Sequence, residues 1–269
     1  MALVVLVLIA LISGLAVAGF AAHRSRAGGA AIVPSDPEPA AGLALAVALA
    51  VLVAGGVVLA VLTFVIRSDP DAIGLDTGAA NWGARHATPF TTDVLDAITF
   101  VGLPRSIAVL AALLAVAETA RTRNRWVVPF VLVVVAGNGI ITTTIKHLAD
   151  RVRPAINPIA ETLGPSFPSG HSSWSAAFFA AAALLLARGR GRRARIVLAG
   201  TAAGAAVAIA ATRVLLGVHW FSDVVAGLAL GWAWFAVCAI AFDRRVFTAR
   251  PAVRDARPAH PPRAAARAR

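Results

Sequence analysis

The sequence predicts an all-α polytopic membrane protein, a helix bundle with a six-span core and one additional N-terminal span. Hydrophobic residues make up 59% of the 269 residues, and the mean hydropathy is +0.79. Both values exceed those of soluble globular domains. The apolar residues also occur in runs of roughly 17 to 25, the length that a helix needs to cross a hydrocarbon core of about 30 Å. Because backbone groups in lipid must hydrogen-bond internally, we expect these runs to be helices.

Seven apolar runs are predicted to span the membrane: 2–22, 42–66, 103–120, 126–146, 170–187, 196–215 and 224–242. The first could be a signal peptide, but it lacks a basic segment before its apolar stretch, so we prefer an uncleaved span. Residues 23–41 are rich in Gly, Ala and Pro and predict a linker, and 42–242 form the six-span domain. Within that domain, the polar segment 67–96 predicts a surface loop with a helix lying along the membrane. The basic tail 243–269 is predicted to be disordered.

The net charge of +12 comes from short arginine clusters beside the apolar runs. Four clusters, at 24–26, 121–125, 188–195 and 244–269, hold 18 of the 25 Lys and Arg residues. With seven spans they all fall on one side, which the positive-inside rule makes cytoplasmic. We therefore expect a protein of the plasma membrane that uses its charge for topology and anionic lipid, with no nucleic-acid partner. The single cysteine lies in an apolar run and excludes a disulfide framework.

Three short patterns lie at the ends of predicted spans, all on the extracytoplasmic face. They are K-x6-R-P from Lys146 to Pro154, P-S-G-H from Pro168 to His171, and T-R-x5-H-x3-D from Thr212 to Asp223. Singly, each residue could be an interfacial anchor or a helix cap. Independent anchors, however, have no reason to gather on the arginine-poor face, where charged groups are costly.

The first property that the patterns share is the ability to bind phosphate. Lys146, Arg153 and Arg213 supply three cations, two of them with the planar fork that suits phosphate oxygens. Ser169 and Gly170 open a helix, where a hydroxyl and free backbone N–H groups can bind the same anion. The sequence thus predicts a phosphate site that contains no metal.

The second shared property is a pair of histidines with separate roles. His219 and Asp223 are four residues apart, so they share one face if a helix begins near Trp220. An aspartate that accepts a ring N–H fixes the tautomer and leaves the other nitrogen free to attack. His171, from another helix, can protonate a leaving oxygen and later deprotonate water. This combination predicts phosphoryl transfer through a phosphohistidine, without a cofactor.

Together the patterns resemble the signature of the type-2 phosphatidic-acid phosphatase superfamily. They match it at every position except Thr212, where serine is usual; threonine keeps the hydroxyl, so we expect the change to be tolerated. The resemblance covers 42–242 as a six-span core, and the stretch from Asp76 to Gly102 is also similar to the family's region before its second span. It implies phosphate binding by Lys146, Arg153, Ser169, Gly170 and Arg213, acid–base catalysis by His171, and nucleophilic attack by His219 with Asp223 as its partner.

We therefore expect an integral membrane phosphatase that hydrolyses a lipid phosphate or diphosphate at the extracytoplasmic interface. Candidate substrates are undecaprenyl or another polyprenyl diphosphate, phosphatidylglycerol phosphate and phosphatidic acid. A lipid phosphotransferase with the same site is one alternative, and an anion transporter that uses the basic cluster is another. The polar residues gather at one end of the spans and not in two matching halves, which disfavours the transporter. His147, Asp150 and Arg151 are expected to shape the rim of the site.

Overall fold

The computed structural model describes residues 38–68, 74–155 and 164–247, and every regular element in these residues is helical. The predicted all-α fold is therefore confirmed. The predicted N-terminal span 2–22 lies outside the described residues, as do most of the linker 23–41 and most of the tail 243–269.

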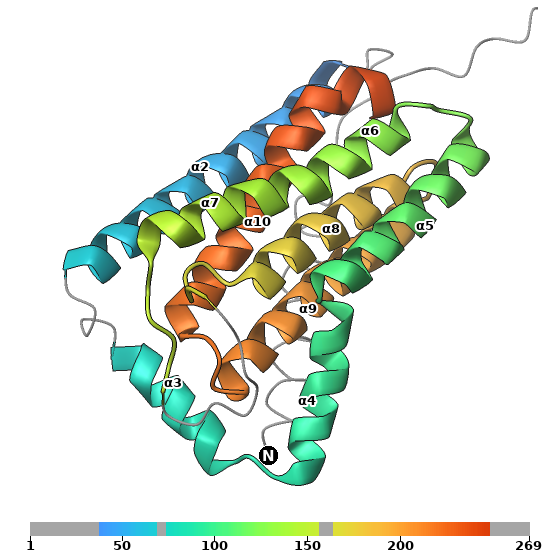
Figure 1. Ribbon diagram of the computed structural model, residues 1–269. Coiled ribbons are helices and arrows are strands. Elements are labelled where there is room, and N and C mark those ends of the chain that lie inside the picture. The colour runs from blue at the N-terminus through green and yellow to red at the C-terminus, as the bar shows by residue number, and fades with distance from the viewer. Residues whose placement is uncertain (1–37, 69–73, 156–163, 248–269) are drawn as a thin grey trace, which may run out of the picture.

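Helices occupy all six positions where core spans were predicted (Figure 1). They are α2 (Glu38–Ser68), α5 (Pro104–Thr122), α6 (Val127–Leu132) with α7 (Asn138–Ala149), α8 (Gly170–Leu186), α9 (Arg192–Leu215) and α10 (Phe221–Phe242). A π-helical turn, Val133–Gly137, joins α6 to α7, and a second one, Asp243–Phe247, follows α10. Among the described residues, three helices are long and apolar enough to cross a membrane, namely Val127–Ala149, α9 and α10. A fourth candidate is the pair of α5 with the helix before it, bent by 47°. The helix α8 and the part Val53–Ile66 of α2 are shorter apolar stretches.

The region between α2 and α5 differs from the prediction, because it holds two helices and not a loop with one. They are α3 (Gly74–Arg85) and α4 (Pro89–Val101). Thr88 caps α4 by accepting a hydrogen bond from the backbone N–H of Thr91, whose hydroxyl accepts one from Thr88. In α3, three glycines lower the helix propensity. Its helical state depends on packing against α9 and α10, which local sequence cannot reveal.

The central helix of the bundle is α10, which packs against α2, α8 and α9 (Figure 1). Gly227 and Gly231 lie one turn apart on the side that faces α8. A Cβ at either position would overlap the carbonyl oxygen of Ser169 or Ser173 in the facing chain. Small residues let two helix backbones approach closely in a membrane. This contact places the start of α8 directly beside the start of α10.

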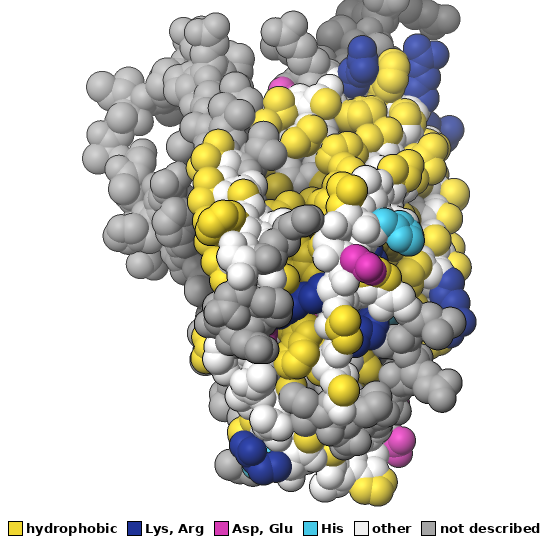
Figure 2. All heavy atoms as spheres, turned by 60° about the vertical axis from the view of Figure 1, so that its left-hand side comes forward, with side chains coloured by type: hydrophobic (Ala, Val, Ile, Leu, Met, Phe, Trp, Pro, Cys, Tyr) yellow, Lys and Arg dark blue, Asp and Glu magenta, His cyan; other side chains and the backbone are white. Residues whose placement is uncertain are grey.

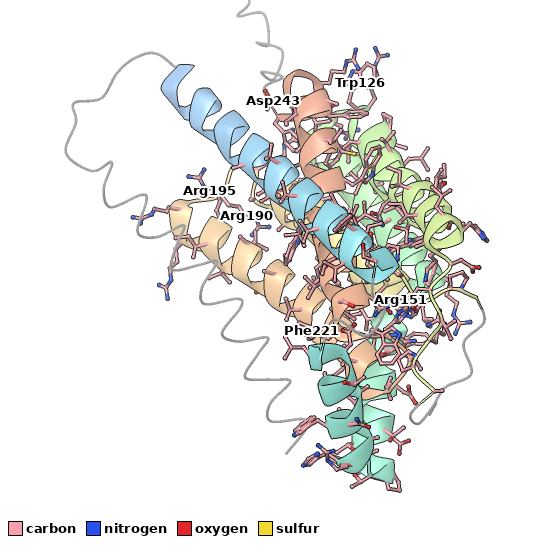
Figure 3. All side chains as sticks on the ribbon, turned by 90° about the vertical axis from the view of Figure 1, so that its left-hand side faces the viewer. Trp126, Arg151, Arg190, Arg195, Phe221 and Asp243 are labelled. Carbon is pink, nitrogen blue, oxygen red and sulfur yellow. The ribbon has the colours of Figure 1, made fainter. Side chains whose placement is uncertain are left out.

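The two ends of the bundle differ in chemistry. Figure 3 shows Trp126, Arg190 and Arg195 toward one end and Arg151 toward the other. At the first end, the guanidinium of Arg245 lies 4.7 Å from the centre of the Trp126 ring. Figure 2 shows hydrophobic side chains gathered over the upper and middle part of one face. The polar residues of the three patterns lie at the second end.

Candidate active site

The structure brings all eight predicted site residues together at the end opposite the arginine-rich turns. Lys146 lies in the last turn of α7, and Arg153 follows in the next loop. Ser169, Gly170 and His171 open α8, Arg213 lies in the last turn of α9, and His219 and Asp223 flank the start of α10. His171 lies within electrostatic range of Arg213, His219, Arg153 and Lys146. Since these residues come from four helices and two loops, the cluster exists only in the folded bundle.

The His219 imidazole is held between a carboxylate and a guanidinium. Its Nδ1 lies 3.3 Å from Asp223 Oδ2, and its Nε2 lies 3.2 Å from Arg153 Nη1. Because a guanidinium can only donate, Nε2 is the acceptor and the ring proton is on Nδ1, which donates to Asp223. The lone pair of Nε2 therefore points toward the cationic side of the site. As predicted, α10 begins close to Trp220, at Phe221, so His219 and Asp223 face each other.

Burial keeps His219 neutral. The residue is 2% exposed, and this burial lowers its pKa from 6.5 to about 4. The positive charges of Arg153 and Lys146 lower the pKa further, while Asp223 opposes the shift through its hydrogen bond and its charge. Burial also lowers the pKa of Arg153, again opposed by Asp223. At neutral pH the imidazole thus has the lone pair that a nucleophile needs.

Backbone carbonyls orient two of the cations. Lys146 Nζ donates to the carbonyl oxygen of Pro165 at 2.7 Å. Arg153 donates from Nε to Gly164 at 2.9 Å and from Nη1 to Val218 at 2.8 Å. Both side chains remain partly exposed. The loop before α8 and the turn before α10 therefore set the direction of both cations without neutralising their charge.

Two buried nitrogens of the cluster have no hydrogen-bond partner among the described residues. They are Nε of Arg213, whose residue is 3% exposed, and Nε2 of His171. Leaving a buried polar group unpaired costs about 1–3 kcal/mol. Such groups are rare and call for an explanation, and two of them in one cationic cluster indicate a place for an anionic ligand.

The hydroxyl of Thr212 links α9 to α4. It donates to the carbonyl oxygen of Ile209 at 2.7 Å and lies 2.6 Å from Thr99 Oγ1. Thr99 Oγ1 also lies 3.5 Å from Nη1 of Arg213. Threonine at this position thus supports the neighbouring arginine through α4, a helix that the sequence analysis did not connect with the site.

The start of α8 offers further donors. Ser169 is fully buried and accepts a hydrogen bond from the Ser172 hydroxyl at 3.0 Å, which leaves its own proton available. The first backbone N–H groups of a helix have no partner within the helix and lie at its positive end. Among the residues that the structure describes, a Cβ added to Gly170 would meet only Lys146 Cε, at 3.9 Å. The glycine therefore keeps space open between the lysine and the helix start.

Arg151 and Asp76 belong to the site, although the sequence predicted a place at the rim for the first and no role for the second. Arg151 is 9% exposed and Asp76 is 3% exposed. Arg151 donates from Nη1 to Asp223 Oδ1 at 2.6 Å and from Nη2 to Asp76 Oδ2 at 2.8 Å. His147 and Asp150 are exposed, as expected of a rim. The position of Arg151 inside K-x6-R-P was the one available signal; Asp76 is 75 residues away from it, too far for any spacing rule.

The arrangement is suited to phosphoryl transfer. Three cations, a serine hydroxyl and a helix start surround a neutral histidine whose tautomer an aspartate fixes, which is the combination that stabilises charge on a transferring phosphoryl group. Among the described residues, no group of three His, Cys, Asp or Glu side chains could hold a metal ion.

Comparison with known proteins gives a family and a fold. The family model of the PAP2 superfamily matches residues 126–247, which contain all three patterns. The lipid A 1-phosphatase of Rhizobium johnstonii is 36% identical over 143 residues, which are 47% of this chain and 54% of that protein. The decaprenylphosphoryl-5-phosphoribose phosphatase of Mycobacterium tuberculosis is 36% identical over 131 residues, 45% of this chain and 64% of that protein. The chain thus spans about half of the first relative and less than two thirds of the second.

A solved structure shares the fold. It is the crystal structure of the first transmembrane PAP2 type phosphatidylglycerolphosphate phosphatase from Bacillus subtilis, with a TM-score of 0.66 and 23% identity. The match covers 74% of this chain and 98% of that chain.

Proposed function

Since the chain belongs to the PAP2 superfamily, we propose that it is an integral membrane phosphatase that hydrolyses a lipid phosphate or diphosphate through a phosphohistidine intermediate. The observation that carries this proposal is the cluster of Lys146, Arg153 and Arg213 around the Nε2 lone pair of His219. Buried nitrogens of Arg213 and His171 that have no partner in the described part of the chain support a phosphate position within the cluster. We assign phosphate binding to Lys146, Arg153, Ser169, Gly170 and Arg213.

In the first step, the Nε2 lone pair of His219 attacks phosphorus, and the bond between phosphorus and the lipid oxygen breaks. His171 gives its proton to the leaving oxygen, which departs as the lipid alcohol or lipid monophosphate. The attack makes the imidazole of His219 cationic, and Asp223 stabilises that charge across its hydrogen bond. The three cations stabilise the negative charge on the equatorial oxygens.

In the second step, a water molecule attacks the phosphohistidine. His171 takes a proton from the water, the phosphorus–nitrogen bond breaks, and inorganic phosphate leaves. His219 returns to its neutral form and His171 to its protonated form. In the overall reaction, water hydrolyses a phosphate ester to an alcohol and inorganic phosphate, or a diphosphate to a monophosphate and inorganic phosphate. No step requires a metal, so the activity should persist in EDTA.

A lipid substrate is supported by the apolar surface beside the site. Val152, between the two arginines of the loop, is 81% exposed, and Leu148, at the end of α7, is 69% exposed. Exposed apolar groups next to a polar site suit a phosphate that is tethered to hydrocarbon in a bilayer. The relatives reported above carry names with different phosphorylated lipids, so the candidates stay polyprenyl diphosphate, phosphatidylglycerol phosphate and phosphatidic acid.

The site is proposed to face the extracytoplasmic side of the plasma membrane, because the arginine clusters at the other end are positive-inside signals. A maleimide labelling experiment tests this. Ala155→Cys, in the exposed part of the loop after Pro154, should react in intact cells when Cys238 is replaced by alanine. Arg190→Cys, exposed at the other end, should react only after lysis. The opposite pattern would reverse the orientation.

The activity is tested with purified protein in detergent and a panel of lipid phosphates and diphosphates. We expect phosphate release from at least one of them, loss of that release in His219→Gln, and inhibition by vanadate, which imitates five-coordinate phosphorus. Release that is independent of His219 would refute the nucleophile, and strong EDTA sensitivity would refute the metal-free mechanism. Analysis of the lipid products separates hydrolysis from transfer to a second lipid. Uptake of phosphate into vesicles without ester cleavage would favour the transporter.

A further inference from the structure

The carboxylate of Asp223 is bound on both sides, and only one of its oxygens faces His219. Oδ2 lies 3.3 Å from His219 Nδ1 and accepts a hydrogen bond from the backbone N–H of Trp220 at 3.0 Å. Oδ1 accepts from Arg151 Nη1 at 2.6 Å. Asp223 is fully buried, so the partners of Oδ1 decide how the carboxylate plane is turned toward the histidine.

Arg151 is itself held by a second buried carboxylate. Its Nη2 donates to Asp76 Oδ2 at 2.8 Å, and its Nη1 also donates to the hydroxyl of Ser222 at 2.7 Å. Asp76 in turn accepts hydrogen bonds from Ser222, from the backbone N–H at 2.8 Å and from the hydroxyl at 2.6 Å. One guanidinium therefore bridges two carboxylates, and α3 is joined to the first turn of α10.

The charges of this network do not cancel beside His219. Two carboxylates and one guanidinium leave one net negative charge beside the imidazole. Arg151 lies 5.5 Å from the ring centre of Trp220, whose Nε1 donates to the carbonyl oxygen of Val152 at 2.9 Å. The guanidinium is thus fixed from two directions, by ion pairs and by a ring. Such a fully satisfied buried network is rigid.

We propose that Asp76 and Arg151 are positioning residues that hold the Asp223 carboxylate and thereby keep His219 in the tautomer protonated on Nδ1. This proposal rests on the proposed function, in which Nε2 of His219 attacks phosphorus. Neither residue contacts the phosphate position, so both act through Asp223. Without Arg151, the Asp223 carboxylate loses the donor that orients Oδ1 and can rotate away from Nδ1.

Kinetics with matched variants test the proposal. Arg151→Gln should lower kcat about 10- to 100-fold, the effect of losing a hydrogen bond to a charged group, with KM within about threefold. Arg151→Lys should recover part of the rate, because one ammonium can pair with one carboxylate but not bridge two. Asp76→Asn should lower kcat about tenfold. In an Asp223→Asn background, Arg151→Gln should change kcat less than about twofold, because residues that act through one another are not additive.

A buried carboxylate at the other end of the bundle, paired with an exposed arginine, provides the structural control. Glu118 is 2% exposed and pairs with Arg121 at 2.6 Å. Glu118→Gln and Asp76→Asn should both lower the melting temperature, but Glu118→Gln should keep kcat within about twofold. If the effects of Arg151→Gln and Asp223→Asn multiply, or if Glu118→Gln lowers kcat as much as Asp76→Asn, the two residues only stabilise the fold and the proposal is wrong.

A second measurement does not depend on activity. With ¹⁵N-labelled histidine and His219→Gln to assign the signal, the ring nitrogens of His219 should report protonation on Nδ1 in the unaltered protein. Arg151→Gln and Asp76→Asn should both populate the tautomer protonated on Nε2. An unchanged tautomer in both variants would overturn the positioning role. If the unaltered protein hydrolyses none of the lipids, the proposed function fails, and this signal still decides whether Arg151 and Asp76 orient His219.

Discussion

Replacing Asp223 by asparagine removes a negative charge that acts chiefly in the transition state. The ring of His219 is neutral before attack and becomes cationic as its Nε2 bonds to phosphorus. At the 3.3 Å between Nδ1 and Oδ2, a full charge pair is worth about 5 kcal/mol at an effective dielectric constant of about 20. The carboxylate divides its charge between two oxygens, one of which Arg151 binds. We therefore expect Asp223→Asn to remove about 3 to 4 kcal/mol of transition-state stabilisation, which corresponds to a loss in kcat on the order of 10²- to 10³-fold.

The same substitution disturbs the tautomer. An asparagine whose oxygen stays on Arg151 turns its NH₂ group toward Nδ1, and two donors then face each other. The imidazole relieves this by moving its proton to Nε2, which removes the attacking lone pair. Because substrate binding involves the neutral ring, KM should change little while kcat falls.

The assay is the initial rate of phosphate release from a lipid phosphate in detergent micelles over a range of substrate concentrations. Asp93→Asn serves as the matched control, since Asp93 is exposed on α4. The melting temperature, followed by circular dichroism, reports folding in each variant. A kcat within tenfold of the unaltered protein, or a loss that appears only in KM, would refute the role of Asp223 beside His219.

Three further predictions concern packing, pH and the lipid surface. Gly231→Ala should lower melting temperature and activity together, with strain of about 1–3 kcal/mol, because its methyl group would overlap a carbonyl oxygen of α8. Gly56→Ala, where no described residue lies within 4 Å of the added methyl group, should lower neither. As the pH falls, kcat/KM should decrease with a midpoint near pH 4, because the lowered pKa of His219 keeps its imidazole neutral down to that pH. A midpoint near 6.5, the ordinary pKa of histidine, would contradict this prediction. Val152→Asp should reduce phosphate release from lipid vesicles several-fold but leave the hydrolysis of p-nitrophenyl phosphate unchanged. Val128 is 47% exposed at the other end, and Val128→Asp should leave both activities unchanged. Equal losses of both activities in Val152→Asp would argue against a lipid-facing role of Val152.

Local sequence was sufficient to predict the six core helices and to single out the residues of the three patterns. Apolar runs of spanning length must be helical in lipid, because no water is present to satisfy the backbone. The spacing of His219 and Asp223 implied contact because four residues make about one helical turn. Lys146, Arg153 and Arg213 stood out as charges at span ends, where charge is costly. Each of these inferences uses residues close in sequence or a property of the solvent.

The residues that hold Asp223, the partner of the reacting histidine, could be identified only in the folded bundle. Arg151 meets Asp223 across 72 residues and Asp76 across 75, and no periodicity connects positions so far apart. The helical state of α3, which carries Asp76, depends on packing that its glycine-rich sequence does not encode. The close approach of α8 and α10 arises where Gly227 and Gly231 meet carbonyl oxygens of the other helix, a fit that exists only between two surfaces. Charge at span ends and helical periodicity can thus be read along the chain, whereas long-range pairing and steric fit are properties of the assembled bundle.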